Sequence, residues 1–199
     1  MIIQADKEKI LEEFLEKYVV DRWVNKFLEI DEMYKSDKDD IEKNLISAFD
    51  EVCRKAICLQ GKQLKGEIKY IYFSLLRTSI LENRGEYRVD LYDEDWFLDK
   101  EECSINIDLN FIFDSIFKQR EELKEKKKVY GKNITDMDIE NVMLKEIDKY
   151  HILAVEFLKG MIGKFIETSS YGEMKKTEDI MILAGEYMDA TEAIYPEKE

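Results

Sequence analysis

Two arginines and one aspartate among aromatic residues are the best candidates for chemistry in this sequence. They lie in residues 68–98, IKYIYFSLLRTSILENRGEYRVDLYDEDWFL. An arginine beside aromatic rings can bind a planar or anionic ligand, or a peptide carboxylate. The alternative is a cross-strand salt-bridge cluster on a half-exposed sheet surface. The candidate ligand-binding residues are Phe73, Arg77, Arg88, Asp90, Tyr92 and Trp96.

The same stretch continues into a strongly acidic segment. Between residues 86 and 110, nine acids stand against two bases. Such a segment is typical of solvated loops and strand edges, and it is also suited to docking a basic partner. The candidate partner-binding residues are therefore Asp93, Glu94 and Asp95.

Metal chemistry has little support in the residue types and their spacing. His151 is the only histidine, and its i,i+3 neighbour Asp148 would need several further ligands from other helices to form a metal site. Asp90 and Asp93 do not begin a calcium-binding EF-hand loop, because neither is followed by glycine at the sixth position. An irregular Mg²⁺ or Ca²⁺ site here, serving a hydrolase, is an alternative. We expect no metal and no cofactor.

Nucleophile and nucleotide-binding motifs are absent from the sequence, which contains no Gly-x-Ser-x-Gly, no P-loop, no Gly-x-Gly-x-x-Gly and no Cys-x-x-Cys. The three cysteines, Cys53, Cys58 and Cys103, lack metal-ligand spacing. We expect reduced thiols in a cytoplasmic protein. The start of the chain lacks the basic and apolar regions of a signal peptide, and no apolar run reaches the length of a membrane span.

A β-hairpin is expected to position the candidate site. The predicted strands are about 68–81 and 86–92, joined by Glu82–Gly85 with glycine in the left-handed conformation. This register pairs Arg77 with Asp90 and Leu75 with Tyr92. Residues 68–81 also fit a helical period, so a helix is the alternative. Residues 104–110 alternate apolar and polar side chains and are a candidate third strand.

Helices are expected to surround this hairpin. The apolar period predicts helices over 6–34, 37–61, 110–129, 135–167 and 177–193. The helix over about 135–167 is apolar on nearly every side from Ile152 onward, so it should be the central helix. Gly160 and Gly163 within it suggest that a neighbouring backbone passes close by. The predicted fold is a single domain, 1–199, of the α+β class and mostly α, with a helical bundle around this helix and one hairpin.

The net charge argues against binding to nucleic acids and to acidic membranes. A chain of charge -14 repels nucleic-acid phosphates and acidic membrane surfaces. With no catalytic motif, we expect a non-enzymatic cytoplasmic protein-interaction or regulatory module, such as an inhibitor or immunity protein, that binds a basic partner. The alternative is a small-molecule sensor that uses the arginine-aromatic cluster. The oligomeric state stays open, and a homo-oligomer is one option.

Overall fold

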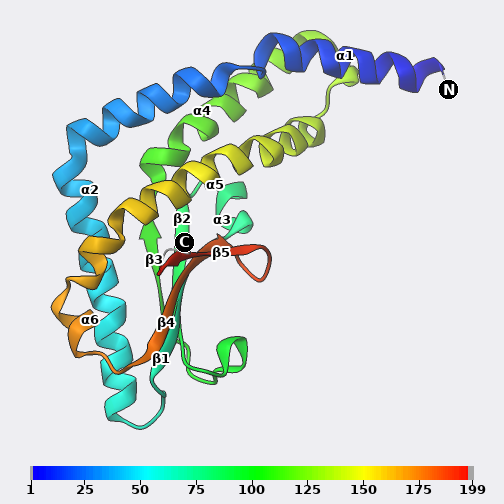
Figure 1. Ribbon diagram of the computed structural model, residues 1–199. Coiled ribbons are helices and arrows are strands. Elements are labelled where there is room, and N and C mark those ends of the chain that lie inside the picture. Colours follow the sequence, from blue (N-terminus) through cyan, green and yellow to red (C-terminus); the bar gives the residue numbers. More distant parts are fainter. Residues whose placement is uncertain (1, 197–199) are drawn as a thin grey trace. The chain divides into compact units, whose positions relative to one another are not determined.

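The computed structural model describes residues 2–196, with side chains from residue 6 onward (Figure 1). The chain is α+β and 63% helical, which confirms the predicted fold class. In chain order the elements are α1 (Ile2–Tyr18), α2 (Arg22–Gly61), β1 (Ile68–Leu75), α3 (Arg77–Leu81), β2 (Glu86–Tyr92), η1 (Trp96–Leu98), β3 (Ser104–Asp108), α4 (Asn110–Lys127), η2 (Lys128–Asn133), α5 (Asp136–Ile166), α6 (Ser169–Glu173), β4 (Lys176–Glu186) and β5 (Thr191–Tyr195).

Contacts along the chain define two compact units. The first, here called the helical unit, contains the residues up to Asp37 together with Phe111–His151. The second, the sheet unit, contains Lys38–Asn110 and the residues from Ile152 onward. Both α2 and α5 contribute residues to each unit. The expectation of a single domain stays a prediction.

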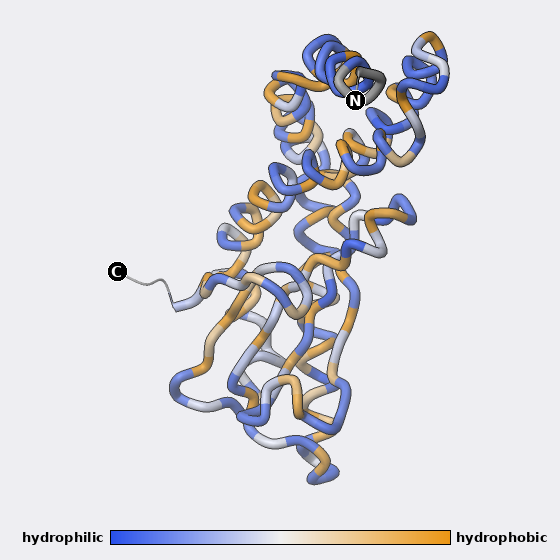
Figure 2. Tube along the Cα trace, turned by 90° about the vertical axis from the view of Figure 1, so that its right-hand side faces the viewer, coloured by the Kyte–Doolittle hydropathy of each residue, from blue (hydrophilic) through white to orange (hydrophobic). Residues whose placement is uncertain are grey.

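The helical unit buries aromatic side chains between its helices. The Phe14 and Tyr130 rings meet edge to face at 5.2 Å, and the Phe27 and Tyr150 rings at 5.5 Å. Phe14 and Tyr150 are fully buried. Hydrophobic and hydrophilic residues are mixed along the helices (Figure 2), as expected for amphipathic helices that bury one stripe.

The chain has one helix break that the sequence does not predict, since α1 ends at Tyr18 and Asp21 has a positive φ of 61°. The break predicted between residues 34 and 37 corresponds to a kink at Asp37, where two helical segments join. The second helix then runs from Arg22 to Gly61, and Asp37 (φ −111°, ψ 18°) is a non-helical residue inside it. The predicted end at Gly61 is confirmed.

The long helix predicted over 135–167 is confirmed as α5, Asp136–Ile166. It begins with a capping box, in which the Asp138 carboxylate accepts the Thr135 backbone N–H at 2.8 Å and Asp138 N–H donates to Thr135 Oγ1 at 3.2 Å. No helix within residues 2–196 is both long and apolar enough to cross a membrane.

The sheet has five strands in the order β3-β2-β1-β4-β5. The β1 and β4 strands are parallel, and the other neighbours are antiparallel. The β3 strand confirms the predicted third strand, but one hairpin and one extra strand undercount the sheet. Because β1 lies at the centre between β2 and β4, most of its residues are buried.

One face of the sheet is apolar and packs against helices. Ile71, Phe73 and Leu75 of β1 lie on it, opposite Leu91, Val89 and Tyr87 of β2. The Phe73 ring stacks on Phe49 of α2 at 6.2 Å and on Phe165 of α5 at 5.6 Å. The sheet-unit parts of α2 and α5 therefore cover this face.

The predicted extent and register of the hairpin are wrong. The first strand ends at Leu75, and Arg77–Leu81 form the short helix α3. Leu75 pairs with Tyr87 rather than with Tyr92, a shift of five residues that moves the odd-numbered β1 residues to the buried face. The positive φ near the turn belongs to Asn83, not to Gly85. Ser79 and Ile80 are buried, which favours a helical turn over a longer strand.

The helix predicted over 177–193 is also wrong, because these residues form β4 and β5. The β4 strand lies between β1 and β5, and residues 182–185 are all buried. A strand buried on both faces loses its period-two pattern, and its continuous apolar run can be mistaken for a buried helix.

Replacing Gly160 or Gly163 with alanine should stabilise the protein by about 1 kcal/mol each. The predicted close backbone is absent, because a Cβ built at either glycine meets nothing within 4 Å among the described residues. Alanine then adds helix propensity without a clash. Denaturant unfolding of each variant measures the gain. Gly185→Ala is the opposing control, because its Cβ would lie 2.2 Å from the Ala190 carbonyl oxygen.

Candidate functional site

The sheet face opposite the helices carries the polar and aromatic side chains. Tyr70 and Tyr72 of β1 pair across the strands with Tyr92 and Asp90 of β2. Ser74 pairs with Arg88. The alternation predicted for β2 is thus confirmed, since Tyr87, Val89 and Leu91 are fully buried on the other face.

Arg88 and Asp90 form an ion pair on this face. Arg88 Nε donates to the two Asp90 carboxylate oxygens at 2.9 and 2.8 Å, and Nη2 donates to Glu102 at 3.0 Å. The hydrogen bond to Asp90 raises the pKa of Arg88, so the guanidinium stays charged. The same guanidinium lies 5.8 Å from the Tyr187 ring centroid. Two carboxylates therefore neutralise Arg88 within the protein.

Arg77 lies elsewhere and has a different partner from the one predicted. It belongs to α3, beyond the end of β1, and its Nε donates to Glu186 Oε2 at 2.6 Å. The expected pairing of Arg77 with Asp90 is wrong, because it depended on a strand that continued past Leu75. The structure therefore places Arg77 and Arg88 in two separate ion pairs.

An aromatic cluster fills the space above the strands. The Trp96 ring contacts Tyr70 edge to face at 4.4 Å, Tyr92 at 5.4 Å and Tyr72 at 5.8 Å. Phe97 lies 6.2 Å from Tyr187, which follows β4. Burial raises the pKa of Tyr72 and of Tyr92, so both phenols remain protonated at neutral pH. We call the following residues the aromatic face: Tyr70, Tyr72, Tyr92, Trp96, Phe97 and Tyr187.

Phe73 does not belong to this face. Its side chain is fully buried under the helices, against Phe49 and Phe165. Of the six candidate ligand-binding residues, Arg88, Asp90, Tyr92 and Trp96 lie on this side of the sheet, Phe73 lies on the opposite face, and Arg77 lies on α3 in an ion pair with Glu186.

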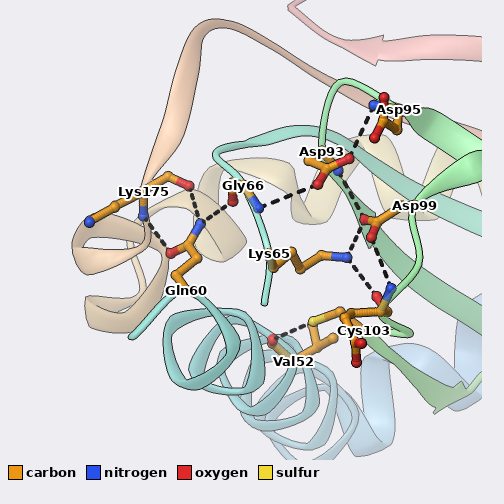
Figure 3. Close-up of polar contacts among 10 residues, drawn as sticks. Val52, Gln60, Lys65, Gly66, Asp93, Asp95, Asp99, Cys103 and Lys175 are labelled. Carbon is orange, nitrogen blue, oxygen red and sulfur yellow. Dashed lines mark hydrogen bonds and ion pairs between the residues drawn. The ribbon is translucent and has the colours of Figure 1, made fainter. Parts of the chain in front are cut away.

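The loop 93–103 is held by a buried ion pair, and Figure 3 shows Lys65 reaching into it. Lys65 Nζ bonds to the Asp99 carboxylate and donates to the Glu101 carbonyl at 2.8 Å. The exposed fractions of the Lys65 and Asp99 side chains are 0% and 3%. Asp99 also accepts the backbone N–H groups of Asp93 and Glu101, each at 3.2 Å. This pair therefore fixes the loop that carries Trp96.

The three candidate partner-binding acids differ in their surroundings. Asp93 accepts the backbone N–H of Gly66 at 3.3 Å and of Asp95 at 3.1 Å, so its carboxylate supports the loop (Figure 3). Glu94 and Asp95 are exposed, and their carboxylates have no ion-pair partner within residues 6–196. Glu94 and Asp95 are thus available to an outside cation, whereas Asp93 is already engaged.

The described residues offer few side chains for metal or thiol chemistry. The described residues contain no group of three His, Cys, Asp or Glu side chains that could hold a metal ion. Burial raises the pKa of Cys53 to about 12 and of Cys103 to about 11, so neither thiol is a nucleophile at neutral pH. Cys58 is exposed. His151 is half-buried on α5.

Two hollows lie away from the aromatic face. One, of about 530 Å³, is in the sheet unit between α2 and the start of α6, and is lined by Asp39, Glu42, Lys43, Ile46, Ser47, Asp50, Thr168 and Ser169. The other, of about 400 Å³, is in the helical unit, and its lining includes Leu11, Leu15, Val19, Trp23 and Val142. Neither is lined by a residue of the aromatic face.

Several residues of this site were not predicted from the sequence. Lys65 is one of two lysines in the segment between α2 and β1, and nothing in its neighbours marks it as the buried one. Tyr187 and Glu186 were expected on a helix. A signal was available for Phe97, because Trp96-Phe97-Leu98 is an apolar triplet in an acidic loop. Comparison of the chain with family models, curated proteins and solved structures gave no match.

Proposed function

We propose that this chain is a non-enzymatic protein-binding module whose aromatic face binds a basic protein partner. One observation carries the proposal: half-exposed aromatic rings lie beside Glu94 and Asp95, exposed carboxylates without ion-pair partners in residues 6–196. Carboxylates free of internal partners attract a cationic surface, and rings supply the apolar area of an interface. A cytoplasmic location, where Cys58 stays reduced, is part of the proposal.

The distribution of charge supports a basic partner. The sheet unit contains 26 Asp and Glu residues against 16 Lys and Arg residues, a net charge of -10 out of -14 for the chain. The acidic excess thus concentrates in the unit that carries the aromatic face. Such a field accelerates the encounter with a positively charged protein, and added salt should weaken it.

Exposed apolar residues beside the face favour a protein partner over a small ion. Leu98 in the 93–103 loop is 82% exposed, and Met188 in the β4–β5 turn is 63% exposed. Tyr187, next to Met188, is 36% exposed. Protein interfaces are enriched in aromatic residues and methionine. The two loops meet through Phe97 and Tyr187, so both can contact one partner.

The alternative, a sensor that binds an anionic small molecule with its arginines, has less support. Arg88 is neutralised by Asp90 and Glu102, and Arg77 is paired with Glu186. An anionic ligand would have to displace these carboxylates. Native mass spectrometry of freshly purified protein would favour this alternative if it detected a retained ligand that Arg77→Ala loses.

The proposal is tested with a biotinylated lysine- and arginine-rich peptide and biolayer interferometry. The double variant Glu94→Gln, Asp95→Asn should weaken binding about twofold to thirtyfold, because each exposed ion pair contributes about 0.2–1 kcal/mol. Asp93 is left unchanged, because its carboxylate holds the loop.

The matched control is Asp40→Asn, Glu51→Gln, which removes the same charge from exposed α2 positions of the same unit. The control should change peptide affinity far less than the loop variant. Equal weakening by the two variants would mean that net charge alone attracts the peptide, and the aromatic face would then not be the binding surface.

A further inference from the structure

We infer that the partner presents an arginine side chain to the Trp96 ring, an inference that rests on the proposed function. Trp96 is the centre of the aromatic face, since its ring contacts Tyr70, Tyr72 and Tyr92. Trp96 is half-buried rather than buried, so part of the residue is exposed to solvent. Tryptophan is the aromatic side chain that attracts a cation most strongly.

Rings of this face already accept cations from within the chain. Arg88 lies 5.8 Å from the Tyr187 ring centroid, and Lys69 Nζ lies 5.8 Å from that of Tyr70. Both rings belong to the face that surrounds Trp96. The surroundings therefore suit a guanidinium or ammonium group, and the exposed part of Trp96 can accept one from outside.

The position of Trp96 is fixed before any partner binds. The buried Lys65–Asp99 pair holds the loop, and Trp96 itself has a φ of 56°. A positive φ is an outlier for a bulky residue, and it persists only where the surrounding structure enforces it. Because the ring is preorganised, binding loses little conformational entropy in ordering it.

Arginine fits this surface better than lysine does. Its planar guanidinium stacks on an aromatic ring and forms bidentate hydrogen bonds to a carboxylate. Glu94 and Asp95 directly precede Trp96 and supply such carboxylates. The exposed Leu98 and Met188 offer apolar contact to the aliphatic part of the side chain.

The test uses a lysine-rich peptide with one arginine, and two versions in which lysine or citrulline replaces that arginine. The arginine peptide should bind the native protein about threefold to tenfold more tightly than the citrulline peptide, the range for an exposed to partly desolvated cation–π contact. It should also bind more tightly than the lysine peptide. The variant Trp96→Leu should reduce the preference for arginine over citrulline to the part that the charge attraction of Glu94 and Asp95 supplies.

A second variant distinguishes loss of the Trp96 ring from a failure of the protein to fold. Trp96→Phe keeps an aromatic ring and should retain part of the preference for arginine, and circular dichroism reports whether each variant is folded. If Trp96→Leu keeps the full native preference for arginine while Glu94→Gln, Asp95→Asn weakens binding, the inference fails and the proposed function stands. If the loop variant and the Asp40/Glu51 control weaken binding equally, the proposed function fails as well.

Discussion

Replacing Lys65 with methionine should lower the free energy of unfolding by about 3–5 kcal/mol, the usual effect of removing one partner of a buried ion pair. The variant leaves the Asp99 carboxylate, 3% exposed, without its counter-charge. Two backbone N–H groups still reach Asp99, from Asp93 and Glu101 at 3.2 Å each. These bonds only partly replace the ammonium group. Urea unfolding followed by circular dichroism measures the loss.

Two further variants separate the ion pair from general effects of the substitution. Lys62→Met removes an exposed lysine from the same connecting segment and should change stability by less than about 0.5 kcal/mol. The double variant Lys65→Met, Asp99→Leu removes both charges, so it should lose less than the two single variants added together. A Lys65→Met protein as stable as Lys62→Met would show that the pair contributes nothing.

The sequence predicts β2 well because its surroundings match its pattern. EYRVDLY alternates between an apolar and a polar face, and the structure keeps this alternation over Glu86–Tyr92, with only Asp90 of the polar face buried. The capping box at Thr135 is equally local, since the interacting groups lie three residues apart. Where a local pattern matches the burial of each residue, the sequence alone is sufficient to predict the secondary structure.

Prediction fails where distant residues decide the outcome. Residues 182–185 are all buried in a strand that lies between β1 and β5, and this removes the alternation that would identify a strand. The choice between strand and helix for Arg77–Leu81 depends on where Ser79 and Ile80 find a buried environment. Neither is visible in a short window of sequence.

The candidate site was predicted only in part, because some of its contacts are local and others depend on distant residues. Arg88, Asp90 and Tyr92 share a face because they alternate on one strand, a purely local property. The partners from other strands depend on register, and the shift of five residues exchanged the expected Arg77 for Tyr72 opposite Asp90. The Lys65–Asp99 pair joins residues 34 positions apart, beyond the reach of any local pattern.

Phe73→Ala should also lower the free energy of unfolding by about 3–5 kcal/mol, because it opens a cavity in the core of the sheet unit. Phe73 is fully buried, and its ring contacts both Phe49 and Phe165, at 6.2 and 5.6 Å. The sequence places Phe73 among the ligand-binding candidates, whereas its position in the structure gives it a role in stability. Urea unfolding of the variant measures the loss.

The matched control is Phe97→Ala, which removes the same ring from the aromatic face, where it is only half-buried. Phe97→Ala should cost less stability than Phe73→Ala, because a half-exposed ring buries less apolar area. It should weaken binding of the arginine peptide more than Phe73→Ala does, measured below the unfolding transition of both proteins. If instead Phe97→Ala lost more stability and Phe73→Ala weakened peptide binding more, the binding surface would lie on the helix-covered side of the sheet. Phe73→Leu keeps most of the buried volume, so a folded Phe73→Leu protein with native peptide affinity would confirm that Phe73 acts through packing alone.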